Sequence, residues 1–150
     1  MAVPIEYIIQ KLLRILMDNL TKTKRSFCMS RIRSKNTKPE MIVKRLLKGL
    51  KVKARYHVSS LPGKPDIVIP KSKLVIFING CFWHQHKNCK RKVMPKTNVK
   101  YWKHKLKRNV LLQKMHILAN KRIGWKVKVL WECQIKNTTK LTRIIRELIK

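Results

Sequence analysis

The stretch KLVIFINGCFWHQHKNC, residues 73–89, joins an apolar run to a loop rich in reactive side chains. The run from Lys73 to Ile78 is rich in Val and Ile and is typical of a β-strand. Cysteine, histidine and aromatic residues follow directly, between Gly80 and Cys89. We therefore expect a strand whose end carries the functional loop.

The flanking sequence predicts a mixed α/β fold. Thr37-Lys-Pro-Glu40 is a capping-box pattern with Pro39 in the first turn, and it predicts a helix starting at Thr37. Leu61-Pro-Gly-Lys-Pro65 is typical of a turn, so we expect a hairpin-like arrangement of the strands around it. The order helix, three strands, helix, strand, helix predicts one mixed sheet with helices packed on it. The other predicted segments are strands at 53–58, 66–70 and 125–131, a helix from Thr97 to Gly124 and a last helix capped by Thr138 or Thr139.

The charge of the chain points to a nucleic-acid partner. Its 38 Lys and Arg residues face only 6 Asp and Glu residues, which gives a formal net charge of +32. Such a charge exceeds what solubility requires and strains the fold by self-repulsion unless a polyanion is bound. Compositional drift toward lysine is the alternative explanation. A length of 150 residues with 44% hydrophobic content fits one domain with its own core.

The first sixteen residues alternate apolar side chains with polar ones such as Glu6 and Arg14. This pattern excludes both a signal-peptide core and a membrane span. We expect residues 1–16 to form an N-terminal extension, helical or weakly packed, ahead of a single domain at residues 17–150. The protein is then expected in the cytoplasm, where its four cysteines favour metal binding or free thiols over disulfides.

Candidate metal ligands gather in the loop. Cys81, His86 and Cys89 fall within nine residues, and Cys133 follows the last predicted strand. Three thiolates and an imidazole form a closed tetrahedral set that suits a structural Zn²⁺. The alternative is buried cysteines beside an unrelated histidine. Cys28 has no such neighbours and is expected to be a small core residue.

Acidic residues are scarce, which makes the position of Asp66 informative. It stands at the start of a predicted strand after a Pro-Gly turn, where it could anchor Mg²⁺ or merely cap the turn. Glu40 is explained by the capping box alone.

Among the histidines, His84 is not needed for zinc and is the best acid-base candidate, although a loop histidine is more often simply exposed. His57, His104 and His116 are expected to be ordinary strand and helix-surface residues.

Aromatic side chains stand among basic ones in the loop. Phe82 and Trp83 precede several lysines, an arrangement that suits the unstacking of a base step while the DNA backbone is held. Trp102, on the next predicted helix, is a further candidate ring for this role. The competing interpretation places these rings in the core or around the zinc, as expected for Trp125 and Trp131 in their apolar strand.

Four motifs follow one another along the chain. They are Met29-Ser-Arg-Ile-Arg-Ser-Lys-Asn-Thr-Lys-Pro-Glu40, Leu61-Pro-Gly-Lys-Pro-Asp66, Val75-Ile-Phe-Ile-Asn-Gly-Cys-Phe-Trp-His84 and Trp131-Glu-Cys133. In this order, and from about Met17 to Cys133, the chain closely resembles the very short patch repair (Vsr) DNA mismatch endonucleases. The resemblance implies a restriction-endonuclease-like core and nicking of one strand beside a T:G mismatch left by deamination of 5-methylcytosine.

The resemblance implies a role for each matching residue. Asp66 would be the central Mg²⁺ ligand, with the backbone carbonyl of Ile78 as the second, and Glu40 would lie near that metal. His84 would be the acid-base histidine. The other matches are the zinc ligands Cys81, His86, Cys89 and Cys133, the intercalating rings Phe82, Trp83 and Trp102, and Met29 at the opposite groove, with Lys64 as a further candidate DNA contact.

The chain departs from the family pattern at three places. Asn79 stands where the best-studied form has a second active-site histidine, and an amide cannot shuttle protons. Asn109 and Gln113, adjacent on one helix face, match an Asn and Asp pair, and Gln113 cannot stabilise a charged imidazole as a carboxylate would. Two residues separate His86 from Cys89 where some members have one.

We therefore expect a Mg²⁺-dependent, zinc-stabilised endonuclease that nicks double-stranded DNA at a T:G mismatch. It is expected to act as a monomer, with mismatch-repair proteins and a cytosine methyltransferase as candidate further partners. Two alternatives remain at this stage. One is a non-catalytic reader of mismatched or distorted DNA, and the other is a basic RNA-binding or ribosome-associated protein.

Overall fold

The computed structural model describes residue 23 and residues 35–149. The predictions for residues 1–16, Cys28 and Met29 lie outside these residues. The core of the fold is a sheet with the strand order β1-β2-β3-β4. Its strands are β1 (Arg55–Tyr56), β2 (Ile67–Ile69), β3 (Leu74–Asn79) and β4 (Lys126–Trp131).

The sheet is mixed, as predicted. The turn between β1 and β2 and the short 3-10 helix η1 (Pro70–Ser72) between β2 and β3 make both of these strand pairs antiparallel. Strand β4 pairs in parallel with β3 after the long crossover through a helix. Five of the six side chains of β3 are buried, and β3 is an inner strand between β2 and β4.

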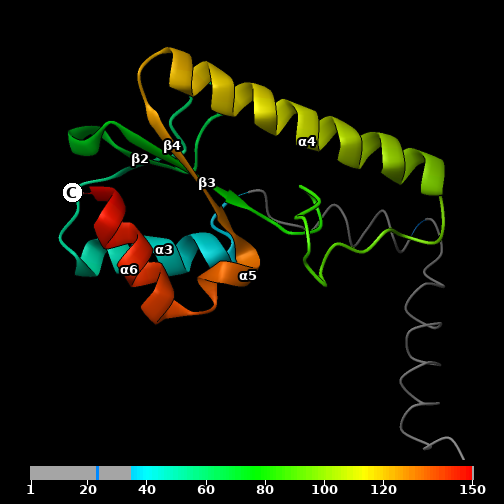
Figure 1. Cartoon of the computed structure of the whole chain (residues 1–150), viewed down its shortest axis with the longest axis horizontal. Helices are drawn as coiled ribbons and strands as arrows, with labels where there is room; N and C mark the ends of the chain where they lie inside the picture. The colour runs from blue at the N-terminus through cyan, green and yellow to red at the C-terminus, as the bar shows by residue number, and fades with distance from the viewer. Residues whose placement is uncertain (1–22, 24–34, 150) are drawn as a thin grey trace, which may run out of the picture.

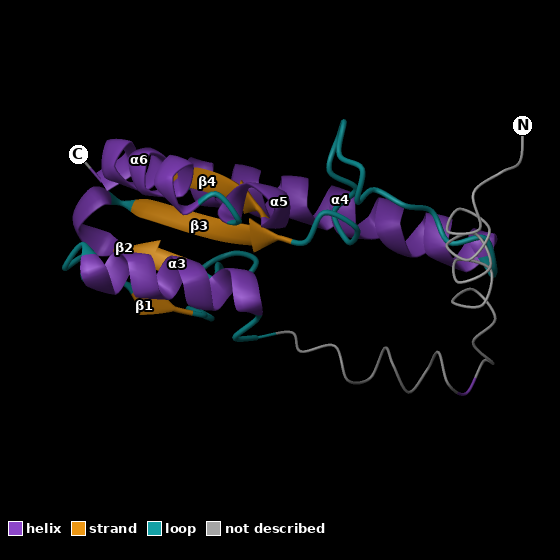
Figure 2. Cartoon of the chain, turned by 90° about the horizontal axis from the view of Figure 1, so that it is seen from below, coloured by secondary structure: helices purple, strands orange, loops and turns teal. Residues whose placement is uncertain are grey.

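Helices cover both faces of the sheet. Figure 1 shows α4 (Val99–Arg122) on one side, and α3 (Lys38–Gly49), α5 (Glu132–Ile135) and α6 (Thr138–Ile149) on the other. Figure 2 shows the sheet on its face from the side of α3 and α6, with its strands side by side and α4 behind them. The N-terminal half of α4 runs past the sheet beside the loop that follows β3 (Figure 1). None of the described helices is both long and apolar enough to cross a membrane.

Two apolar clusters form the core because successive strand side chains point to opposite faces. Ile76 joins the larger cluster, which Val43, Leu47, Leu141 and Ile145 complete from the helices α3 and α6. The smaller cluster lies on the other face and consists of Val68, Val75 and Phe77, with Trp125 and other partly buried side chains packed against it.

Two local features differ from the predictions. The strand predicted over residues 53–58 is reduced to Arg55–Tyr56, because His57 has a left-handed φ of 51° that no strand accommodates. Helix α5 was not predicted and places Cys133 in a helical turn directly after β4. Trp131 stacks on His86, which puts its ring beside the candidate metal ligands, one of the two positions expected for it.

Candidate active site and metal-ligand cluster

The antiparallel pairing of β2 and β3 brings Asp66 to the end of β3. Asp66 directly precedes β2, and its Oδ2 accepts a hydrogen bond of 2.6 Å from the backbone N–H of Ile78. Burial raises the pKa of Asp66 to about 6, while this hydrogen bond opposes the rise and the nearby Glu40 adds to it. A buried carboxylate next to another carboxylate is a site that a divalent cation would stabilise.

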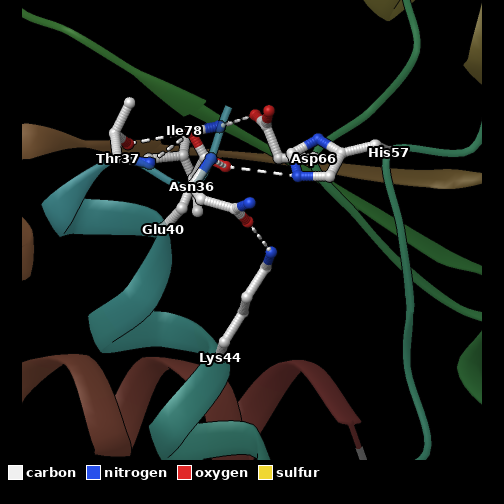
Figure 3. A network of polar contacts seen from close by, with 7 residues as sticks. All are labelled: Asn36, Thr37, Glu40, Lys44, His57, Asp66 and Ile78. Carbon is white, nitrogen blue, oxygen red and sulfur yellow. Dashed lines mark hydrogen bonds and ion pairs between the residues drawn. The ribbon is translucent and has the colours of Figure 1, made fainter. Parts of the chain in front are cut away.

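Glu40 has two kinds of partner (Figure 3). It closes the start of α3, because its Oε2 accepts the Asn36 backbone N–H at 2.9 Å and its Oε1 accepts the Thr37 hydroxyl at 2.8 Å. Its Oε2 also lies 3.4 Å from Nε2 of His57. Glu40 is 4% exposed, so the capping role predicted from the sequence is present, and the same buried carboxylate faces Asp66.

His84 lies with Asp66 in one cavity of about 710 Å³. Burial lowers the pKa of His84, so the imidazole is neutral at pH 7. Its Nδ1 and the Nε2 of Gln113 are both buried and have no hydrogen-bond partner within the described chain. The cavity is also lined by Glu40, Lys64, Ile78, Asn79, Trp83, Asn109, Gln113 and His116.

Three amide side chains line the cavity together with His84. Asn79 is 3% exposed at the end of β3. Asn109 donates from Nδ2 to the backbone carbonyl of Trp83 at 3.3 Å, which ties α4 to the residue preceding His84. Gln113 lies one turn further along α4 and lines the same cavity, as its four-residue spacing from Asn109 predicts. These amides can orient an imidazole but add no charge.

The four sequence-predicted zinc ligands converge on one point. Their ligand atoms all lie within 4.8 Å of one another. Nδ1 of His86 lies 3.7 Å from Sγ of Cys81 and 3.4 Å from Sγ of Cys133. Around a tetrahedral Zn²⁺, sulfur and nitrogen ligands are separated by about 3.6 Å. Both distances are close to this value, and Cys89 completes a set of four that could hold a metal ion.

Neighbouring groups hold this metal-ligand cluster in place. Trp131 stacks on the His86 ring, with centroids 4.0 Å apart and planes inclined by 9°. Arg91 donates to Oε1 of Glu132 at 2.7 Å, joining the loop to helix α5. Burial raises the pKa of Cys81 to about 12, so a metal is needed to hold it as a thiolate at neutral pH.

The predicted wedge rings form a second cluster beside the cavity. Phe82 packs edge-on against Trp83 at 5.0 Å between centroids and against Trp102 at 5.5 Å. Trp102 is 4% exposed and supports the other two rings from α4. The ammonium of Lys105 lies 5.6 Å from the Trp83 ring centroid, which adds positive charge where the rings reach the surface.

A buried amide fixes the turn that carries Asp66. Asn120 of α4 is fully buried and donates from Nδ2 to the backbone carbonyl of Pro62 at 2.8 Å. Gly63 has a φ of +75°, and a Cβ there would lie 2.4 Å from the ring of His116. His116 is thus packed against the turn instead of lying on the helix surface as predicted, and Lys64 follows with a φ of 48°.

Sequence reasoning missed His57, which lies beside Glu40 and Asp66. The pairing register of β1 and β2 is the feature that would have placed His57 opposite Asp66. Tyr56 pairs with Ile67, so the next residues along each strand, His57 and Asp66, are also opposite one another. The backbone N–H of His57 accordingly donates to the carbonyl of Asp66 at 3.1 Å.

Known proteins resemble the chain over most of its length. Residues 17–91 match the family model described as DNA mismatch endonuclease Vsr. The chain is 37% identical to the type II nicking enzyme V.XorIIP of Xanthomonas oryzae pv. oryzae, over 88% of this chain and 96% of the relative. It is 40% identical to V.NmeAIP of Neisseria meningitidis serogroup A, over 87% and 96%. It is 36% identical to the DNA mismatch endonuclease Vsr of Escherichia coli, over 81% and 77%.

Proposed function

The chain belongs to the DNA mismatch endonuclease Vsr family, and on that basis we propose that it is a Mg²⁺-dependent endonuclease that nicks one strand of DNA at a T:G mismatch. The observation that carries the proposal is the shared cavity, in which Asp66 and His84 lie next to Trp83. A catalytic carboxylate, an acid-base group and a ring able to enter the base stack are the parts that such a reaction requires.

In this proposal Asp66 and the backbone carbonyl of Ile78 hold Mg²⁺, and Glu40 faces the ion. The two carboxylates support this assignment, since one oxygen of each lies within 4.8 Å of the other and burial raises the pKa of Asp66. A bound Mg²⁺ would supply Lewis-acid stabilisation of charge on the phosphate oxygens. The Ile78 N–H holds the Asp66 carboxylate in place through Oδ2.

His84 is the proposed acid-base residue. Its burial keeps the imidazole neutral, so it can accept a proton near neutral pH. We propose that Gln113 orients the ring through its side-chain amide, while Asn79 contributes only hydrogen bonds. Asn109 supports the loop through the carbonyl of Trp83. Because Gln113 is neutral, it stabilises a protonated His84 less than a carboxylate would.

For DNA binding we assign Phe82, Trp83 and Trp102 as the ring set that enters the base stack beside the mismatch. Phe82 and Trp83 are partly exposed and pack on the buried Trp102, which supports the assignment. Met29 at the opposite groove and Lys64 at the edge of the cavity are further proposed contacts. The net charge of +32 supplies the attraction to phosphates that is independent of sequence.

The cluster of Cys81, His86, Cys89 and Cys133 is proposed to hold a structural Zn²⁺. A closed set of four ligands leaves no position for substrate, so this ion would fix the loop rather than take part in hydrolysis. We further propose that residues 17–150 form one domain with a restriction-endonuclease-like core, acting as a monomer. Its four-stranded mixed sheet with helices on both faces is compatible with that core.

A strand-nicking assay on end-labelled duplexes tests the proposal. Duplexes with T:G or C:G at one position are incubated with the zinc-loaded protein in Mg²⁺ or without divalent cation. Mg²⁺-dependent nicking confined to the T:G duplex is the expected result. Tighter binding to T:G with no nicking in varied sequence contexts would instead establish the non-catalytic reader. Equal binding to both duplexes and to RNA would overturn the proposal altogether.

A further inference from the structure

His57 occupies a position that the proposed metal site does not yet explain. It follows β1 in a left-handed conformation, with φ of 51°, and this turns its side chain toward Glu40 and Asp66 (Figure 3). The conformation is uncommon for a residue with a side chain. Its backbone N–H bond to the Asp66 carbonyl, at 3.1 Å, fixes the imidazole beside the acidic pair.

The imidazole presents a nitrogen that has no hydrogen bond. Nε2 of His57 is buried and lacks a hydrogen-bond partner among the described residues, although it lies 3.4 Å from Oε2 of Glu40. Histidine nitrogens in such positions usually find a donor or acceptor, since an unpaired buried polar atom is costly. A ligand placed between this nitrogen and the carboxylates would remove that cost.

The spacing of the three side chains fits a single divalent ion. One ligand atom each from Glu40, His57 and Asp66 lies within 4.8 Å of the others. Around an octahedral ion with bonds of about 2.1 Å, adjacent ligands are about 3 Å apart and opposite ligands about 4.2 Å apart. The 3.4 Å between His57 and Glu40 therefore corresponds to adjacent positions after a small contraction.

We propose that Nε2 of His57 is a direct ligand of the divalent cation held by Asp66 and Glu40, and that this nitrogen strengthens the preference of the site for Mn²⁺ over Mg²⁺. The inference rests on the proposed function, because it concerns the same ion. Imidazole is a poor ligand for the hard Mg²⁺ and a good one for transition metals, whereas Mn²⁺ accepts both nitrogen and carboxylate. An all-oxygen site should favour Mn²⁺ over Mg²⁺ less strongly.

Electron paramagnetic resonance of Mn²⁺ tests the proposal without relying on activity. Mn²⁺ is titrated into the zinc-loaded full-length protein, and the signal of free Mn²⁺ gives the Kd. Competition with Mg²⁺ gives the relative affinity, and pulsed measurements detect any nitrogen bound to Mn²⁺. Labelling the histidines with ¹⁵N shows whether that nitrogen is an imidazole.

Three variants assign the signal. Asp66→Asn should abolish Mn²⁺ binding at this site, so the Mn²⁺ signal that it removes belongs to the site. His57→Asn is chosen because asparagine tolerates positive φ better than most residues, which protects the fold. His104→Asn is the matched control on the exposed surface of α4. Circular dichroism confirms that each variant is folded.

The expected result is an Asp66-dependent Mn²⁺ site with a histidine nitrogen signal that His57→Asn removes and His104→Asn leaves unchanged. The Kd for Mn²⁺ should rise about 10-fold or more in His57→Asn, with a smaller change for Mg²⁺. An Asp66-dependent site without a histidine nitrogen, or with one that survives His57→Asn, overturns the inference and leaves the proposed function standing. The absence of any Asp66-dependent Mn²⁺ binding overturns the metal role of Asp66 as well.

Discussion

Replacing Asp66 with asparagine should stabilise the fold in the absence of divalent cation. Burial raises the pKa of this carboxyl from 3.8 to about 6. Between these two values the folded protein binds more protons than the unfolded chain, so the free energy of unfolding decreases as the pH rises through this window. Above pH 6 the ionised carboxylate lowers the stability by about 3 kcal/mol relative to an equivalent group that stays neutral.

Asparagine keeps an oxygen that can accept the Ile78 N–H bond of 2.6 Å but has no charge to desolvate. The Asp66→Asn variant should therefore be more stable than the wild type by about 2 to 3 kcal/mol at pH 7, and by about half of that at pH 5. The assay is urea unfolding of both zinc-loaded proteins at the two pH values without Mg²⁺. Glu147→Gln, at an exposed carboxylate of α6, is the control and should change stability by less than about 0.5 kcal/mol.

Addition of a divalent cation should make the wild type more stable than the Asp66→Asn variant. An ion that binds only the folded wild type stabilises it in proportion to the logarithm of its concentration, whereas the asparagine variant should gain little. A variant that is less stable than the wild type at pH 7 would refute the reasoning. So would a difference in stability that is the same at pH 5 and pH 7, because then the charge of Asp66 would not be its cause.

Three further predictions concern other parts of the molecule. Trp83→Ala should lose most of the preference for T:G over C:G duplex in a gel-shift titration while salt-dependent nonspecific binding remains, and equal loss on both duplexes would contradict the wedge. Cys133→Ser should lose the single zinc measured by a chromogenic chelator after unfolding, with Cys28→Ser as the control that retains it. Asn120→Ala should lower the free energy of unfolding by about 1 to 2 kcal/mol, because it leaves a buried carbonyl unpaired, whereas the exposed Met115→Ala should change it by less than about 0.5 kcal/mol. Equal effects of these last two substitutions would show that the buried amide does not clamp the turn.

Local signals predicted much of this fold. The capping box at Thr37 correctly predicted the start of α3, because it depends on hydrogen bonds within four residues. The apolar run before Asn79 correctly predicted β3. Cys81, His86 and Cys89 were recognised from their short spacing, and Cys133 was added because strand order brings the end of β4 to the end of β3.

The remaining features depend on contacts between distant segments. His57 was taken for a strand residue because the sequence gives no sign of its positive φ, and its partner Glu40 lies on another element. The sequence did not single out Asn120, because its burial depends on contact with the distant Leu61–Pro65 turn. Helix α5 spans only four residues, too few for a recognisable hydrophobic period.

The most direct test of the catalytic centre is the single-turnover rate of nicking of a T:G duplex by Asp66→Asn in saturating Mg²⁺, compared with wild type and with Glu147→Gln. Because the asparagine variant should be at least as stable as the metal-free wild type, a loss of rate in Mg²⁺ cannot be ascribed to unfolding. The account predicts nicking at the wild-type rate for Glu147→Gln and a loss of at least about 10³-fold for Asp66→Asn, with mismatch binding retained. Nicking by Asp66→Asn at a rate close to that of the wild type would contradict it.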